Sequence, residues 1–96
     1  MEIENWLNLF KARGFTLSTA CQRRLEEEFL NRVNDAVERK KRQKEEIKEV
    51  EMAGKVYMRS LARAMMHAAR ERDTNVLEEE DLDVALRELG PLPPLD

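Results

Sequence analysis

The sequence predicts an all-α fold, and three observations support this prediction. Apolar residues recur at three- and four-residue spacing along most of the 96 residues, which is the period of a helix that packs on one side. The chain holds only three glycines and three prolines, and Gly14 and Gly90 stand where helices are expected to end. No segment alternates apolar and polar residues over more than a few positions, so we expect no sheet.

We expect a single helical domain over residues 1–96. Its small size and its 39% of charged residues leave little apolar material for a core, which favours an obligate partner. The expected helices cover residues 3–13, 19–40, 44–72 and 78–89, and a tail covers residues 90–96.

The first two expected helices carry clear amphipathic patterns. The helix over residues 3–13 ends at Gly14, and its Trp6, the only tryptophan, is expected to anchor the core rather than to dock another chain. Thr19 and Gln22 have the spacing of a capping box at the start of the second helix. The apolar face of that helix consists of Leu25, Phe29, Val33, Ala36 and Val37.

Residues 38–46 contain no apolar side chain and carry five basic and three acidic groups. Their residue types all favour helix, so two alternatives stay open. The chain either continues as one long rod through residues 19–72 or turns near Lys40 to Gln43 and folds into a hairpin. Ile47 and Val50 then resume the apolar stripe at helical spacing.

The third and fourth helices are separated by a polar loop. Tyr57, Leu61, Ala64, Met65 and Ala68 share one face of the third helix. The polar run 72–75 interrupts the pattern, and the acidic run 78–81 suits the positive end of a new helix dipole. Gly90 and Pro91 end the fourth helix.

A long helix, a loop and a short helix that begins with Glu80-Asp81 before Leu82 resemble the second half of the histone fold. The similarity to the archaeal type of histone covers roughly residues 44–89, and the helical lid of AAA+ ATPases is a related arrangement. The resemblance implies that Leu77 begins the last helix and that Ala85 is a core position. Nothing before residue 44 resembles the glycine-containing first loop of the family.

Thr74 departs from the histone pattern. It stands where the family has a loop arginine that pairs with the acid now at Asp81, so this pair is either absent or supplied by Arg72. The resemblance implies a dimer with a copy of the chain or a related histone-fold-like chain, with a long central helix and an extra N-terminal helix. The expected dimer interface consists of Tyr57, Leu61, Met65, Ala68, Leu82 and Ala85.

Basic residues are the best sequence evidence about partners. In the histone family, paired loops grip the phosphates of double-stranded DNA, and the corresponding residues here would be Arg39, Lys40, Lys41, Arg42, Lys44, Arg70, Arg72 and Thr74. A hairpin would bring the first five toward the loop of a partner subunit that contains the last three. The alternative is a solvated helix surface with Glu38–Arg42 and Lys41–Glu45 pairs. Arg59, Arg63 and Arg70 are expected on the solvated side of the third helix rather than in a second binding stripe.

Three functions therefore stay open. The first is a DNA-binding or chromatin-associated histone-like dimer. The second is an assembly module of a transcription, replication or chromosome-maintenance complex that does not contact DNA. The third is a helical hairpin used only for oligomerisation. The net charge of −3 and the pI near 5.3 do not fit a nonspecific DNA coat, and the acidic C-terminal third favours the second function over the first.

Other function classes find little support in the sequence. We expect no enzyme, because a glycine-rich phosphate loop and a nucleophile with an upstream base are both missing. We expect no cofactor and no metal, because His67 is a single histidine without neighbouring ligands. Cys21 is expected to be a packed side chain. The single cysteine and the lack of a long apolar run lead us to expect an intracellular protein, in the cytoplasm, nucleoid or nucleus, without a membrane partner.

Overall fold

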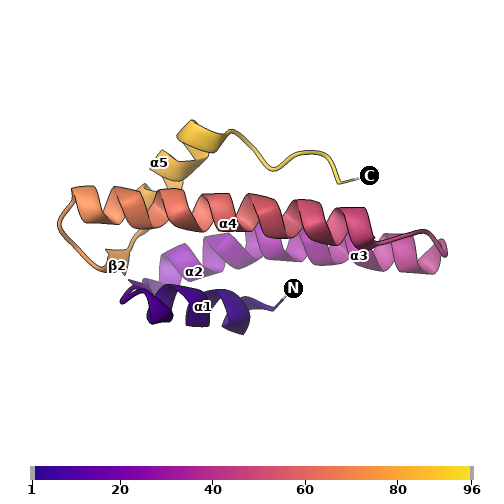
Figure 1. The fold of residues 1–96 in the computed structure, drawn as a ribbon, viewed down its shortest axis with the longest axis horizontal. Coiled ribbons are helices and arrows are strands. Elements are labelled where there is room, and N and C mark those ends of the chain that lie inside the picture. The colour runs from indigo at the N-terminus through magenta and orange to yellow at the C-terminus, as the bar shows by residue number, and fades with distance from the viewer. Residues whose placement is uncertain (1, 96) are drawn as a thin grey trace.

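The structure is a computed structural model that describes residues 2–95, and it confirms the all-α prediction. Its main feature is a hairpin of two long helical segments. The first segment consists of α2 (Thr19–Leu25), the π-helical turn η1 (Glu26–Leu30) and α3 (Asn31–Arg42), and the second is α4 (Lys48–Glu71). The short helices α1 (Ile3–Ala12) and α5 (Glu79–Leu89) pack on opposite sides of this hairpin (Figure 1).

The N-terminal helix α1 is held by two aromatic side chains. Trp6 and Phe10 lie four residues apart on its inner face, and both are buried. The helix ends shortly before Gly14, whose φ of 83° lies in the left-handed region that glycine adopts without a Cβ clash. This turn directs Phe15 into the core, where it is 5% exposed.

The loops after α1 and α4 are joined by two short strands, β1 (Thr16–Leu17) and β2 (Val76–Leu77). They pair in parallel, with Thr16 opposite Val76 and Leu17 opposite Leu77, so the expectation of no sheet is wrong. Two-residue strands are too short to produce an alternating pattern, which explains the error. The pair sets the first residues of α2 and α5 at one end of the hairpin.

The first segment of the hairpin starts with Ser18 as the N-cap of α2, not with the predicted Thr19–Gln22 capping box. The Ser18 Oγ accepts a hydrogen bond of 3.1 Å from the backbone N–H of Cys21. The β1–β2 pair fixes this start, because the Ser18 N–H donates to the Leu77 carbonyl. Further along, the π-helical turn adds a residue to one turn, so the adjacent Phe29 and Leu30 are both buried.

Residues 43–47 join α3 to α4, so the chain forms the hairpin and not the rod. Lys44 lies in the left-handed region with a φ of 56°. The carboxylate of Glu46 accepts hydrogen bonds from the backbone N–H groups of Ile47 and Lys48. This contact satisfies the first free N–H groups of α4, which therefore begins at Lys48 and not at the predicted residue 44.

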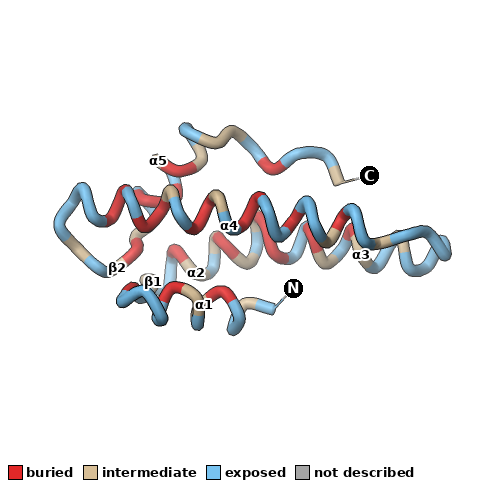
Figure 2. Tube along the Cα trace, in the orientation of Figure 1, coloured by how far each residue is buried: buried red, intermediate tan, exposed pale blue. Residues whose placement is uncertain are grey.

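The core lies along the inner faces of the hairpin and under the two short helices, while the hairpin turn is exposed (Figure 2). Phe29 and Tyr57 stack across the hairpin with ring centroids 5.9 Å apart. The largest side chains that are fully buried are Phe10, Leu25, Val33, Met58, Leu61, Met65, Met66, Leu77 and Leu82. The principal extents of 47, 24 and 19 Å show that the molecule is elongated along this hairpin.

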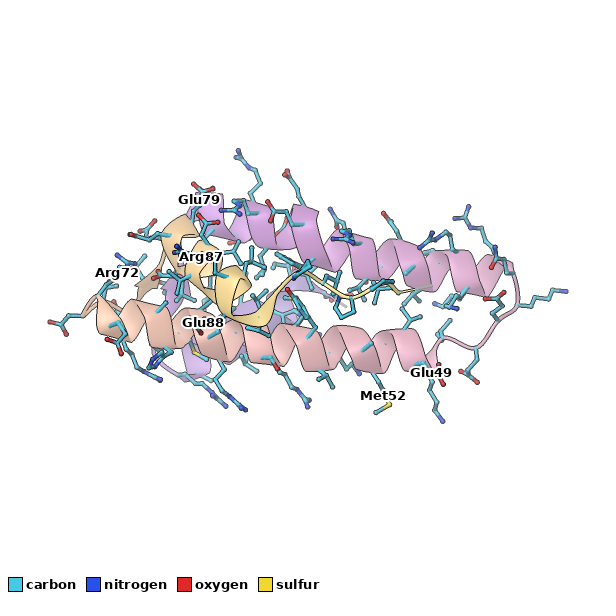
Figure 3. The ribbon with its side chains drawn as sticks, turned by 90° about the horizontal axis from the view of Figure 1, so that it is seen from above. Glu49, Met52, Arg72, Glu79, Arg87 and Glu88 are labelled. Atoms are coloured by element: carbon cyan, nitrogen blue, oxygen red, sulfur yellow. The ribbon has the colours of Figure 1, made fainter. Side chains whose placement is uncertain are left out.

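The tail after α5 runs between α3 and α4 in the view from above (Figure 3), and its residues 94 and 95 line a hollow with residues of both helices. It is attached at its start, where the Tyr57 hydroxyl donates a hydrogen bond of 2.8 Å to the Gly90 carbonyl. Leu92 is 5% exposed and joins the core.

Candidate nucleic-acid interface

Five of the predicted DNA-binding residues lie at the closed end of the hairpin. Arg39, Lys40, Lys41 and Arg42 form the last turn of α3, and Lys44 lies in the connection to α4. All are exposed except Lys40, which is half-buried and forms an ion pair of 3.3 Å with Glu45. We call residues 39–44 the hairpin tip. Basic residues at the end of a helix also stabilise the negative end of its dipole, which gives this cluster a structural role.

The other three predicted DNA-binding residues lie near the opposite end of the hairpin, so one chain does not bring the two groups together (Figure 1). Arg70 lies over the Phe15 ring, with 5.2 Å between its guanidinium carbon and the ring centroid. The Thr74 hydroxyl accepts a hydrogen bond from the Val76 N–H. Thus each of these two side chains already has a partner within the chain.

Arg72 holds the loop to α5. Its guanidinium donates to both carboxylate oxygens of Asp81, at 2.9 and 2.6 Å, and lies 3.0 Å from Glu80. The hydrogen bonds to Asp81 raise the pKa of Arg72 above its ordinary value. Asp81 is 1% exposed and also accepts the Glu78 N–H at 2.8 Å. Of the two alternatives for the loop pair, the structure therefore has the one in which Arg72 supplies it.

The six predicted dimer-interface residues are covered by their own chain. Tyr57, Leu61, Met65 and Ala68 belong to the inner face of α4, and Leu82 and Ala85 belong to α5. None is more than 8% exposed. In this conformation they need no second chain to bury them, because the fold brings both halves of the apolar surface together. A second chain could contact them only by replacing a part of this one.

The outer face of α4 carries a basic surface that the sequence analysis assigned to solvent. Lys55, Arg59, Arg63 and Arg70 follow at spacings of four, four and seven residues, which places them on one side of the helix, and all four are exposed. We call these four residues the α4 ridge. Met52 belongs to the same face and points away from α5 and the tail (Figure 3).

The charges of the α4 ridge are not neutralised by the protein. Within residues 2–95, Lys55, Arg59 and Arg63 form no ion pair. The helix itself has no acidic residue from position 52 to position 70. One acid is close, since Glu2 lines a shallow hollow together with Lys55 and Arg59. The missing acids between Glu51 and Glu71 are the sequence signal from which this surface could have been found.

Acidic groups gather instead on the face that carries α5. Arg24 of α2 forms ion pairs with Asp83 at 2.9 Å and with Glu79 at 3.7 Å, and a third with Glu28 on its own segment. Of the acids of α5, Asp81 is buried, and Glu79, Glu80, Asp83 and Glu88 are exposed; Figure 3 labels Glu79 and Glu88. The molecule therefore has an acidic side around α5 and a basic side along α4.

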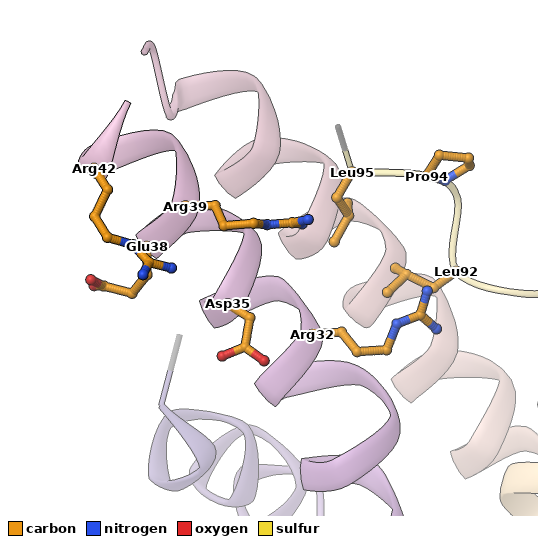
Figure 4. Close-up of a pocket in the computed structure, with 8 residues that line it drawn as sticks. All are labelled: Arg32, Asp35, Glu38, Arg39, Arg42, Leu92, Pro94 and Leu95. Atoms are coloured by element: carbon orange, nitrogen blue, oxygen red, sulfur yellow. The ribbon is translucent and has the colours of Figure 1, made fainter. Parts of the chain in front are cut away.

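An open hollow lies beside the tail, between α3 and residues 92–95 (Figure 4). Arg32 and Arg39 extend from α3 toward the tail, and Asp35 and Glu38 lie in the same wall. Positive and negative groups are nearly balanced there. In the described part of the chain no buried side-chain nitrogen or oxygen lacks a hydrogen-bond partner. The hollow thus offers no unsatisfied group that would orient a small molecule.

Among residues 2–95, no cluster of three or more His, Cys, Asp or Glu side chains is suited to hold a metal ion. None of the helices in that range combines the length and apolar character that crossing a membrane requires. No family model, curated protein or solved structure matches the chain. The evidence about function therefore comes from the chemistry of the protein surface.

Proposed function

We propose that this chain is a histone-like helical protein that binds the phosphate backbone of double-stranded DNA through the α4 ridge and pairs with a second copy or a related chain. The observation that carries the proposal is a row of four exposed basic side chains that form no ion pair within residues 2–95, on a protein whose net charge is −3. A row of basic side chains along one face of an acidic chain is a surface suited to a polyanion.

The spacing of the ridge fits contact with a phosphate backbone. Four residues of helix advance about 6 Å, so the ridge from Lys55 to Arg70 extends over about 22 Å. Each Lys or Arg that neutralises a phosphate releases condensed counterions, which supplies affinity independent of sequence. The acidic side around α5 would repel the duplex, so only one face of the molecule would bind. Contacts of this kind position a protein on DNA without reading bases.

One feature supports the histone-like part of the proposal. Arg72 forms the pair with Asp81 that the resemblance implied. One feature departs from it, because residues 43–47 interrupt what would be one central helix. Support for the histone-like part therefore comes from the loop between α4 and α5, and not from the connection at residues 43–47.

The test compares three charge variants in titrations of a short random-sequence duplex at several salt concentrations. Replacing Lys55, Arg59 and Arg63 by Gln should reduce the slope of log K against log salt by about one unit for each residue. Replacing Arg23, Arg32 and Arg87, three exposed arginines outside α4, by Gln removes the same charge and should leave most of the slope intact.

The third variant replaces Lys40, Lys41 and Arg42 of the hairpin tip by Glu. If this hairpin-tip variant loses DNA binding and the ridge variant does not, the DNA interface lies at the tip and not on the α4 ridge. Equal losses in the ridge variant and in the Arg23, Arg32 and Arg87 control would mean that only the net charge matters, and would refute a defined surface. Circular dichroism of each variant checks that the helices remain folded.

A second candidate function is an assembly module without DNA contact. It is favoured by two exposed apolar side chains on α4, Met52 at 63% and Val56 at 60% exposure. Apolar groups on an otherwise charged surface are common where another protein docks. Absence of binding to the duplex at about 50 mM salt would favour this second function.

A further inference from the structure

The connection between the two long helices is bent and largely exposed. Residues 43–47 have the sequence Gln-Lys-Glu-Glu-Ile, which contains neither Gly nor Pro and consists largely of good helix formers. Lys44 nevertheless adopts a φ of 56°, a conformation that residues with a Cβ rarely take. Residues 43–46 are exposed and Ile47 is only half-buried, so little packing holds the bend in place.

The contacts that favour the bend are local. The Glu45 N–H donates to the Lys40 carbonyl at 2.8 Å, and Glu46 caps the start of α4. Both groups are exposed or near the surface, where water can replace these hydrogen bonds. The bend therefore opposes the helical preference of its own sequence with a few solvent-accessible contacts.

Several contacts join the two halves of the fold, residues 3–42 and residues 48–95. The β1–β2 pair, the Phe29–Tyr57 stack and the ion pair of Arg24 with Asp83 each join one half to the other. None of these contacts depends on the covalent connection at residues 43–47. The same contacts can form when the two halves come from different molecules.

We propose that two copies of the chain exchange halves, with residues 43–47 becoming helical so that residues 19–71 form one continuous helix. Each N-terminal half then packs on the C-terminal half of the other copy and reproduces the contacts of the closed chain. This proposal deepens the pairing stated in the proposed function, on which it rests, and does not depend on DNA binding.

A second copy is the fitting partner because the charges around the bend are complementary between halves. The end of α3 is basic, with Arg39 to Arg42, while the connection contains Glu45 and Glu46 and the first turn of α4 contains Glu49. Lys40, Glu46, Glu49 and Val50 line one small hollow, which shows that these basic and acidic ends lie together. In the exchanged pair the two long helices run antiparallel, so each basic segment lies along the acidic segment of the other copy.

The exchange predicts one large distance within a chain. Arg23 and Glu71 are exposed and lie near the same end of the closed hairpin, whose cross-section is 24 by 19 Å. In a continuous helix their separation of 48 residues becomes about 72 Å. Spin labels on R23C and E71C, in a C21A background and diluted with unlabelled chain, measure this distance within single chains, while light scattering gives the mass in the same buffer.

Each outcome decides a different part of the proposal. A dimer with the distance near 72 Å supports the exchange. A dimer with only the short distance overturns the exchange and leaves pairing intact. A monomer at all accessible concentrations overturns the exchange and self-pairing together, whatever its affinity for DNA.

Two variants of Lys44 independently test whether the conformation of the bend controls the exchange. Lys44→Gly should favour the closed monomer, because glycine accepts the left-handed conformation and disfavours helix; Lys44→Ala should favour the exchanged dimer. The equilibrium between the bent and the helical connection should differ about thirtyfold between the two variants. Because two chains straighten in each dimer, the dimer dissociation constants should differ roughly a thousandfold. Equal dissociation constants, or the opposite order, would show that the bend does not control pairing.

Discussion

Replacing Leu61 by Ala tests whether the apolar surface of α4 is buried in the folded protein. Leu61 lies in the middle of α4 and is 0% exposed, so the change removes apolar side-chain carbons from a closed core and leaves a cavity. Substitutions of this type cost about 2–5 kcal/mol of unfolding free energy. We take about 3 kcal/mol, because the flexible Met58 and Met65 one turn away can move partly into the space.

The expected loss is large for a chain of this size, whose total stability should be roughly 5–15 kcal/mol. It corresponds to a decrease in Tm of roughly 10–25 °C. Met52→Ala is the matched control on the same helix, since Met52 is 63% exposed and its loss should cost less than about 0.5 kcal/mol. Urea unfolding followed by circular dichroism at equal protein concentrations measures both variants. Equal stability of the two variants would refute the packing described for α4.

Three other predictions concern single contacts. Tyr57→Phe removes the hydrogen bond to the Gly90 carbonyl and should lower the unfolding free energy by about 1 kcal/mol, as measured in urea; an unchanged midpoint would mean that this bond does not hold the tail. Leu82→Asp places a charge at a site with 0% exposure and should abolish most helicity in circular dichroism, so a folded variant would contradict the packing of α5. Burial raises the pKa of the Cys21 thiol from 9.0 to about 12, so at pH 8 the folded chain should hold about a thousandfold less thiolate than the unfolded chain and react correspondingly slowly with a disulfide reagent. The folded pKa lies above the unfolded one, so the stabilising contribution of Cys21 is complete below pH 9 and declines toward pH 12; similar reaction rates with and without urea would contradict its burial.

Helical periodicity made most of the fold predictable. The apolar stripes place the four expected helices within a few residues of α1, the α2–α3 segment, α4 and α5. The choice between rod and hairpin was not predictable, because residues 38–46 favour helix in either case. The bend depends on specific hydrogen bonds such as those of the Glu46 cap. The helix propensities of single residues carry no information about such bonds. The β1–β2 pair escaped prediction since it joins residues about 60 positions apart.

The candidate site was harder to predict than the fold. Clustering in sequence drew attention to the hairpin tip, although Lys40 there is paired with Glu45. The α4 ridge is dispersed in sequence and becomes one surface only on the folded helix. What marks this surface is that Lys55, Arg59 and Arg63 form no ion pair within residues 2–95, and this depends on where α1 and α5 pack. The pair of Arg72 with Asp81 was one of two alternatives that the histone resemblance left open, and the structure adds that Asp81 is buried.

The most direct measurement is the affinity of the unmodified chain for a short random-sequence duplex at about 50 and 200 mM salt. Four phosphate contacts by the α4 ridge predict a slope of log K against log salt of about −3.6, which is roughly a hundredfold loss of affinity over this range. Binding with that slope would support DNA-backbone contact by the basic face of α4. Absent binding at 50 mM salt, or affinity that does not change with salt, would contradict it.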